Sequence, residues 1–490
     1  MMTRKSRRLL TLISVLCATY LVLLIPDSSP PSPPPDEREP FAWNQNKYWS
    51  LLERGFQQAR ASDCSDLSIS ISDGFASVDS LLGLLRSESK MPDAPLLSRL
   101  EDEYFRLAVL VGACPDRAAE YLATYSKLRE RVKRQSVKWD MDSKIARDRL
   151  YRLLYGGRLA VEEVMLQSSA EIVPEVMHET DESSVTPTAS ILGVTIHSGD
   201  ILVSRGGAPT SALIARGNDY PGNFSHVALA HVSEATGELS IIEAHIECGV
   251  AVAKLEDYIR DTKLRIMALR LRSDLSAMVD DPLLPHRAAT FALERARREH
   301  IPYDFAMDAE DHTQLFCSEV VSEAYEQVGI DLWLGLSHIS GAGTRSWLAG
   351  FGVRHFITQE PSDLEYDPQL VVVAEWRGYE TLLKSRTDDA VVDVMLEYAN
   401  DGAELEYDLY MLPLARIAKA YSVVLNQFGA VGPVPEGMSA TAAMRNEWFS
   451  ARHREAADKL TVLANRFRQA QGYSPPYWKL IELAREAYGS

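Results

Sequence analysis

The stretch QLFCSEVVSEAYEQVG, residues 314–329, carries the clearest information on the fold of this chain. Apolar residues recur after Cys317 at helical spacing, which predicts an amphipathic helix that begins near Cys317 and ends at Gly329. The thiol is therefore expected at a helix N-terminus, where free N–H groups and the helix dipole stabilise the nucleophilic thiolate. A cysteine considered alone is more often a small buried hydrophobic residue, so a nucleophile needs a partner elsewhere in the chain.

A candidate partner lies upstream, in the strand-like run NFSHVALAHV. Ala228 and Ala230 share a strand face with His226, and two such small residues leave room for another element beside the imidazole. A general base must lie within hydrogen-bond reach of its nucleophile, and this pattern allows that arrangement. Considered alone, His226 is more often interpreted as a polar residue at the end of a strand, so the role of base depends on the other residues of the set.

A second strand-like run, LSIIEAHIECGV, supplies a candidate third residue. Glu243 lies in its apolar centre, where a carboxylate is costly unless it is paired. We expect Glu243 to accept the second imidazole N–H of His226, which fixes the tautomer and stabilises the imidazolium. His245 lies two residues further on the same face and is the rival for this role. With an imidazole partner, the thiol of Cys317 is expected to have a lowered pKa, and that of Cys248 is not.

A zinc site built from His226, His231, His245 and Cys248 is the competing interpretation of these strands. The two pairs are separated by five and three residues, which sends the members of each pair to opposite faces of a strand. Phosphate-binding loops are also not indicated, because the SRGG run lacks the Walker spacing and a following lysine. We therefore expect neither a metal nor another cofactor.

The fold class expected around these residues is α+β. Short β-type runs broken by Gly, Pro and Asn begin near Ser190 and are followed by two helical patterns, HRAATFALERARREH and CSEVVSEAYEQVG. We place this domain at residues 190–385.

Five motifs follow one another in this domain: SGDILVSRG, FSHVAL, IIEAHIECGV, PYDFAM and LFCSEVV. In this order they resemble the permuted papain-like, NlpC-type family of cysteine amidases and hydrolases, whose permuted branch has the histidine strand before the cysteine helix. His226 precedes Cys317 by 91 residues, in agreement with the permuted order. The resemblance implies a circularly permuted papain-like domain, in which a small antiparallel sheet or barrel is combined with the nucleophile helix.

The resemblance also implies roles for individual residues. Cys317 matches the nucleophile, His226 the general base and Glu243 the third, polar residue. Asp200 in the SGD motif matches an acidic turn position, and Tyr303 with Asp304 matches a motif that precedes the nucleophile helix.

Two positions depart from the family pattern. His300 stands where a small glycine is usual, and Leu315 and Phe316 stand where tyrosine-rich pairs are common. These departures affect the expected fit of the substrate more than the nucleophile.

The composition of the chain limits the number of domains and the classes of function to be considered. A chain of 490 residues predicts two to four domains, and 46% hydrophobic residues are ample for buried cores. The formal net charge of −18 argues against nucleic-acid binding as the main activity. Five cysteines exclude a disulfide-built scaffold.

The N-terminus resembles a membrane signal. Four basic residues are followed by 17 uncharged ones, Leu9 to Ile25. We interpret residues 1–26 as a transmembrane signal anchor, with a cleaved signal peptide as the alternative. The basic cluster predicts a single-pass membrane protein whose bulk lies on the non-cytoplasmic side, periplasmic or extracellular.

The remaining chain divides by composition and periodicity. We predict a Pro-rich linker at 27–40, a helical region at 41–170, an acidic linker at 171–189 and a helical C-terminal region at 386–490. Cys64 and Cys114 lie in the first helical region and are either disulfide-bonded or two buried thiols.

Together these features predict a membrane-anchored cysteine hydrolase that cleaves an amide or ester bond through a thioester. A peptide or a lipid acyl group is the candidate substrate. An acyltransferase that uses the same thioester is the first alternative, and a non-catalytic binding module on a papain-like scaffold is the second. The membrane is the partner expected through the N-terminal helix, no nucleic-acid partner is expected, and the sequence indicates no particular protein partner.

Overall fold

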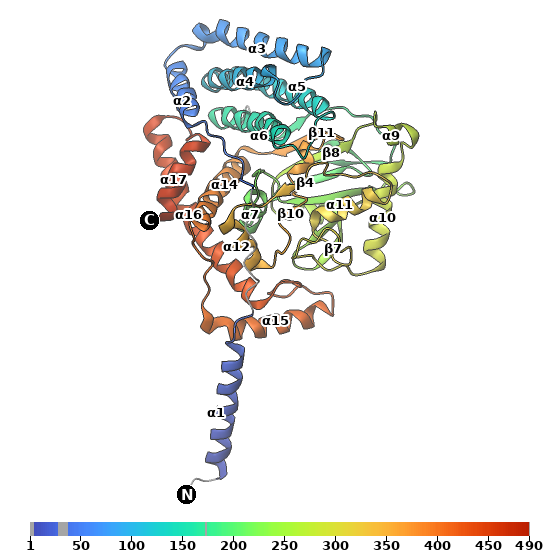
Figure 1. The fold of residues 1–490 in the computed structure, drawn as a ribbon, viewed down its shortest axis with the longest axis vertical. Coiled ribbons are helices and arrows are strands. Elements are labelled where there is room, and N and C mark those ends of the chain that lie inside the picture. Colours follow the sequence, from blue (N-terminus) through green and yellow to red (C-terminus); the bar gives the residue numbers. More distant parts are fainter. Residues whose placement is uncertain (1–3, 28–37, 172–173, 490) are drawn as a thin grey trace.

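The computed structural model of the chain describes residues 4–27, 38–171 and 174–489, with side chains described from Ile13 onward. Figure 1 shows a central sheet with a layer of helices, α3 to α6, along one side. The C-terminal helices α14, α16 and α17 gather beside that layer, and α1 projects from the body next to α15.

The central sheet has the strand order β1-β11-β8-β4-β5-β6-β7, and all neighbouring strands are antiparallel. Its strands are β1 Val176–His178, β4 Ile201–Gly206, β5 His226–Val232, β6 Leu239–His245, β7 Gly249–Lys254, β8 Lys263–Leu271 and β11 Leu370–Arg377. Two further pairs are β2 Thr188–Ile191 with β3 Val194–His197, and β9 Ser337–His338 with β10 Ile357–Thr358. The inner strands are almost continuously apolar because both faces of the sheet are covered.

The helices fall before, within and after the sheet. The first group comprises α1 Arg4–Leu23, α2 Asn46–Arg60, α3 Cys64–Ser87, α4 Pro95–Ala113, α5 Ala118–Ser136 and α6 Lys144–Gln167. The sheet region contains α7 Pro209–Arg216, α8 Leu255–Arg260, α9 Ser276–Asp280, α10 Leu284–Arg298, α11 Cys317–Glu326, α12 Ala342–Phe351 and α13 Asp363–Tyr366. The last group comprises α14 Tyr379–Asn400, α15 Leu412–Asn426, α16 Ala440–Gln471 and α17 Tyr477–Gly489, and two 3-10 turns lie at Pro115–Arg117 and Leu409–Met411.

Different elements cover the two faces of the sheet. Helices α10 and α11 pack on β5 and β6, and Val227 and Leu229 are part of their core. Ala228 and Ala230 belong to the core of the opposite face, together with the β2–β3 hairpin and α8. This alternation follows from the two-residue period of a strand. The domain is thus a mixed helical and antiparallel-sheet fold, as the sequence predicts.

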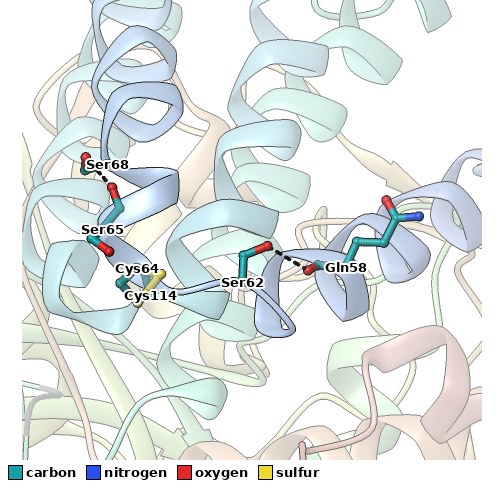
Figure 2. The surroundings of a disulfide bond; sticks show 6 residues. All are labelled: Gln58, Ser62, Cys64, Ser65, Ser68 and Cys114. Carbon is teal, nitrogen blue, oxygen red and sulfur yellow. Dashed lines mark hydrogen bonds between the residues drawn. A yellow bond between two sulfur atoms is a disulfide. The ribbon is translucent and has the colours of Figure 1, made fainter.

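The first helical region is closed by a disulfide. Cys64 is the first residue of α3 and Cys114 directly follows α4, and their sulfur atoms are bonded to each other (Figure 2). The structure therefore decides between the two alternatives left by the sequence. A cross-link across 50 residues restricts the unfolded chain and is expected to stabilise this region.

A buried network of ion pairs joins the helical layer to the sheet and to α14. Arg265 of β8 lies 2.8 Å from Glu162 of α6, and Arg386 of α14 lies 3.6 Å from the same carboxylate. Arg129 of α5 lies 2.7 Å from Glu179. Although burial opposes ionisation of Glu162, the guanidinium groups of Arg265 and Arg386 hold its pKa below the usual value. Buried ion pairs therefore hold the flanking helices to the sheet. Each buried charge is costly unless its partner of opposite charge is present.

This network gives a stability prediction. Glu162→Gln should lower the free energy of unfolding by about 3–5 kcal/mol, because it removes the nearest anion of the buried Arg265 and one of the two anions beside Arg386. Urea unfolding followed by circular dichroism measures the change. Glu120→Gln, which removes an exposed ion pair with Arg117, is the control and should cost less than about 1 kcal/mol. Equal losses in the two variants would contradict the role of the buried network.

The expected membrane anchor is wrong. Among the helices of the described residues, none is long and apolar enough to cross a membrane. Residues 1–3 and the side chains of 4–12, which include the basic cluster, lie outside the described part. The prediction of a single-pass membrane protein with its bulk on the non-cytoplasmic side depended on this helix and is therefore also wrong.

The structure describes little of the first predicted linker and most of the second. Most of the Pro-rich stretch 27–40 lies outside the described residues. The acidic stretch 171–189 contains strand β1, which pairs with β11 at the edge of the sheet. The backbone hydrogen bonds of β1 are made with β11, so the strand depends on a distant segment. The sequence of the stretch itself does not indicate a strand.

Candidate active site

The nucleophile candidate lies where the sequence places it, at the first residue of a helix. Helix α11 begins at Cys317, and the carboxyl of Glu319 accepts a hydrogen bond of 2.8 Å from the backbone N–H of Phe316. This cap satisfies one of the donors that a helix start leaves free. Val320 and Val321 anchor the helix in the core with β5, and Cys317 is only 4% exposed.

Burial controls the ionisation of the thiol. It raises the pKa of Cys317 to about 12, and the nearby carboxyl of Glu360 acts in the same direction. The backbone N–H groups of Val227 and Ser318, which lie near the sulfur, oppose this rise. The expected lowered pKa is therefore wrong for this arrangement, because the loss of hydration outweighs the helix N-terminus. The pKa of the Cys248 thiol is also raised by burial, in agreement with expectation.

A carboxylate joins the two candidate histidines. The imidazole Nε2 of His226 lies 2.7 Å from one oxygen of Glu243, and Nε2 of His245 lies 3.2 Å from the other. The antiparallel register that pairs Ala228 with Glu243 brings these strands together. Glu243 thus contacts His226 as predicted, but His245 is a second partner of the same carboxylate rather than its rival.

The shared carboxylate makes the two imidazoles unequal. Burial lowers the pKa of His226, although the hydrogen bond to Glu243 opposes the effect. The hydrogen bond to Glu243 raises the pKa of the less buried His245. Burial would raise the pKa of Glu243, but its bonds to the two imidazoles outweigh this and lower it. His226 is therefore suited to stay neutral and accept a proton, with an anion in place to stabilise the product.

The structure brings the thiol to the strand of His226 without joining the two side chains. The sulfur of Cys317 lies near the backbone N–H of Val227, the residue that follows His226, and this N–H favours the thiolate. Within the described part of the chain, the imidazole of His226 bonds to Glu243 and makes no hydrogen bond to this sulfur. His226 is 18% exposed and the carboxylate behind it 2%. The exposed edge of the imidazole is thus the approach to the site.

Two further groups lie in the surroundings of the thiol, the buried Glu360 and the partly buried Tyr303. Glu360 follows β10, and its Oε2 has no hydrogen-bond partner in the part of the chain that the structure describes. Burial raises the pKa of its carboxyl well above the usual value. Burial also raises the pKa of Tyr303, and the charge of a Cys317 thiolate would add to the rise. Tyr303 was found from its motif, whereas sequence reasoning missed Glu360, which has no motif and reaches the site only through the fold.

The remaining motif residues have structural contacts. Both oxygens of Asp200 bind the guanidinium of Arg270 at 2.8 Å, and one also accepts the N–H of His197. Asp304 accepts backbone N–H groups of the loop that follows it. His231, from the zinc interpretation, stacks on His286 instead. Among the described side chains, no three ligating groups are arranged to hold a metal ion.

The segment between α15 and α16 flanks the site. Val434 and Met438 pack against Phe305 and Ile246, which adjoin the Tyr303 motif and His245. Glu436 lies 3.0 Å from the imidazole of His300. His300, the first departure from the family pattern, therefore contacts the C-terminal region.

Comparison with known proteins identifies the domain. Residues 195–370 match the family described as permuted papain-like amidase enzyme, YaeF/YiiX, C92 family. The resemblance carried by the five motifs is thereby confirmed for this part of the chain, and the family supports a hydrolytic enzyme.

Other comparisons add little. Among solved structures, similarity is found to the crystal structure of the metalloprotein yiiX from Escherichia coli O157:H7, with 19% identity and a TM-score of 0.29. The match covers 37% of this chain and 97% of that chain. No curated protein matches at a significant level.

The buried thiol gives a prediction on reactivity. In a Cys17→Ser, Cys248→Ser background only Cys317 remains free, because Cys64 and Cys114 are bonded to each other. Alkylation by iodoacetamide should be slow at neutral pH and increase continuously toward the pKa of about 12. In urea the same cysteine should react as an ordinary thiol of pKa ~8.5. A fast, pH-independent reaction of the folded protein from about pH 6 upward would instead indicate a preformed thiolate–imidazolium pair.

Proposed function

We propose that this protein is a cysteine hydrolase of acyl compounds, with Cys317 as nucleophile, His226 as general base and Glu243 as the residue that orients His226. The observation that carries the proposal is the 2.7 Å hydrogen bond between His226 and Glu243, on the strand whose next N–H contacts the sulfur of Cys317. A buried carboxylate bonded to an imidazole, on the strand that packs against a helix-start thiol, supplies the groups that nucleophilic catalysis uses, although the imidazole is not bonded to the sulfur in the arrangement of the described residues.

The reaction follows from the charges of these groups. The thiol is protonated and His226 is neutral, so the sulfur attacks the carbonyl carbon as its proton passes to His226. Glu243 stabilises the imidazolium formed by this transfer. The imidazolium returns the proton to the leaving amine or alcohol, and a thioester on Cys317 remains. Water, activated by the same imidazole, then cleaves the thioester and releases the acid.

The backbone supports the developing negative charge. The N–H groups at the start of α11 are not all used within the helix, so they are suitable donors to the oxyanion. Because the thiol is 4% exposed, the substrate acyl group has to reach it past the imidazole of His226, which is 18% exposed. The substrate class is an acyl amide or ester, with a peptide or a lipid as the source of the acyl group.

Hydrolysis of a panel of p-nitrophenyl esters and acyl-p-nitroanilides tests the proposal. Cys317→Ala should abolish turnover, and His226→Ala should lower kcat/KM by about 10²–10⁴-fold. His231→Ala is the matched control, because it removes an imidazole of the same strand that does not contact Glu243. Turnover that survives Cys317→Ala, or equal losses in the two histidine variants, would overturn the proposal. Added hydroxylamine that diverts most of the product to hydroxamate would favour the acyltransferase instead.

The pH profile gives an independent prediction. His226 must be neutral to act as base, and its pKa lies below the usual ~6.5, so kcat/KM should fall only at pH values below about 6.5. Glu243→Gln removes the anion that supports the protonated imidazole. The acidic limb should therefore move to still lower pH, while the rate falls by about 10²–10⁴-fold. An unmoved limb would mean that Glu243 does not act through His226.

A further inference from the structure

A second site candidate lies away from the proposed active site. A cavity of about 630 Å³ opens between α2, α6, α14 and α17, which lie close together in Figure 1. This volume is within the range of small-molecule sites. Neither Cys317, His226 nor Glu243 lines it. The cavity therefore needs an explanation separate from the hydrolytic reaction.

Aromatic side chains form much of its wall. The ring centroids of Trp43 and Trp49 are 5.7 Å apart, and Trp49 stacks on Trp478 at 5.8 Å. Tyr151 and Tyr155 form a second stacked pair on the lining, with centroids 4.6 Å apart. Aromatic rings offer apolar surface together with negatively polarised faces, which attract organic cations.

The charges on the wall favour a cationic ligand. Among the described residues, the lining contains six carboxylates and two guanidinium groups, Arg216 and Arg485; the carboxylates are Glu53, Glu163, Asp219, Asp393, Glu397 and Glu482. Glu163 and Glu482 are paired with Arg386 and Lys479, which lie outside the lining. Both guanidinium groups are already bound in two-point ion pairs, Arg216 to Asp393 at 2.7 and 2.8 Å and Arg485 to Glu397 at 2.8 and 2.7 Å. An anionic ligand would therefore have to compete with these carboxylates for the guanidinium groups.

Glu53 is the carboxylate best placed to receive a cation. It accepts hydrogen bonds of 3.0 Å from the indole N–H of Trp478 and from the hydroxyl of Tyr473. Both donors are neutral, and within the described residues Glu53 makes no ion pair. The two bonds fix the carboxylate beside the tryptophan wall and leave its charge uncompensated. Acceptor capacity also remains, because each carboxylate oxygen has two lone pairs.

We propose that this cavity binds an organic cation, an ammonium group attached to an apolar chain or ring. The ammonium is held by Glu53 and the indole ring of Trp478, and the apolar part lies among the aromatic side chains. This binding does not depend on hydrolysis by Cys317.

A panel of three ligands with the same chain tests the proposal. Octyltrimethylammonium, octanoate and octan-1-ol are titrated below their aggregation limits into the full-length protein, with tryptophan fluorescence and calorimetry as readouts. The cation should bind saturably with a 1:1 stoichiometry and about tenfold more tightly than either of the others. Equal or tighter binding of octanoate or octanol, or no saturable binding of the cation, would overturn the proposal.

Two variants locate the site. Glu53→Gln should weaken binding of the cation about tenfold and leave that of octanol unchanged, because only the charge is removed. Glu447→Gln removes an exposed carboxylate of α16 outside the cavity and is the matched control, with no expected effect. Equal effects of the two variants would show a non-specific response to net charge and refute the assignment to Glu53. The comparison of the three ligands on the unaltered protein remains decisive if a variant does not fold.

Discussion

The packing of α11 against β5 is the constraint on which the proposed active site depends. The apolar face of this helix, with Val320 and Val321, is buried against the side of the sheet that carries Val227 and Leu229. The same burial places the sulfur of Cys317 at the N–H of Val227 and raises the pKa of its thiol to about 12. Burial of this helix face thus both positions Cys317, the proposed nucleophile, and keeps its thiol protonated. Its activation has to come from a base rather than from a standing thiolate.

Glu243 supplies the compensating charge. A carboxylate that is 2% exposed in a strand is tolerated because two imidazoles donate to it, one to each oxygen. The more buried His226 is held neutral, whereas protonation of His245 is favoured. This difference supports His226, rather than His245, for the proposed role of base, although the two residues have similar positions on neighbouring strands. The roles of Cys317, His226 and Glu243 in catalysis are those of the proposal and rest on this arrangement together with the amidase family match.

Local patterns in the sequence predict the parts of this account that depend on neighbours along the chain. The start of α11 at Cys317 follows from helical spacing, and the contact between His226 and Glu243 follows from two adjacent strands. Properties set by distant segments could not be predicted. The thiol pKa depends on how completely the fold excludes water, and Glu360 reaches Cys317 from a loop without a motif. Hydropathy alone likewise misjudged the N-terminal helix, for which the described residues provide no membrane span.

Buried ion pairs bind the flanking helices to the central sheet, and an aromatic, acidic cavity opens among those helices. The most direct test of the central claim is capture of the acyl-enzyme. The protein is mixed with a p-nitrophenyl ester, quenched in acid at the shortest times and digested for mass spectrometry. The account predicts that the peptide containing Cys317 gains the mass of the acyl group before steady turnover and that the adduct is lost by hydrolysis. Turnover without acylation of Cys317, or acylation only of Cys248, would contradict it.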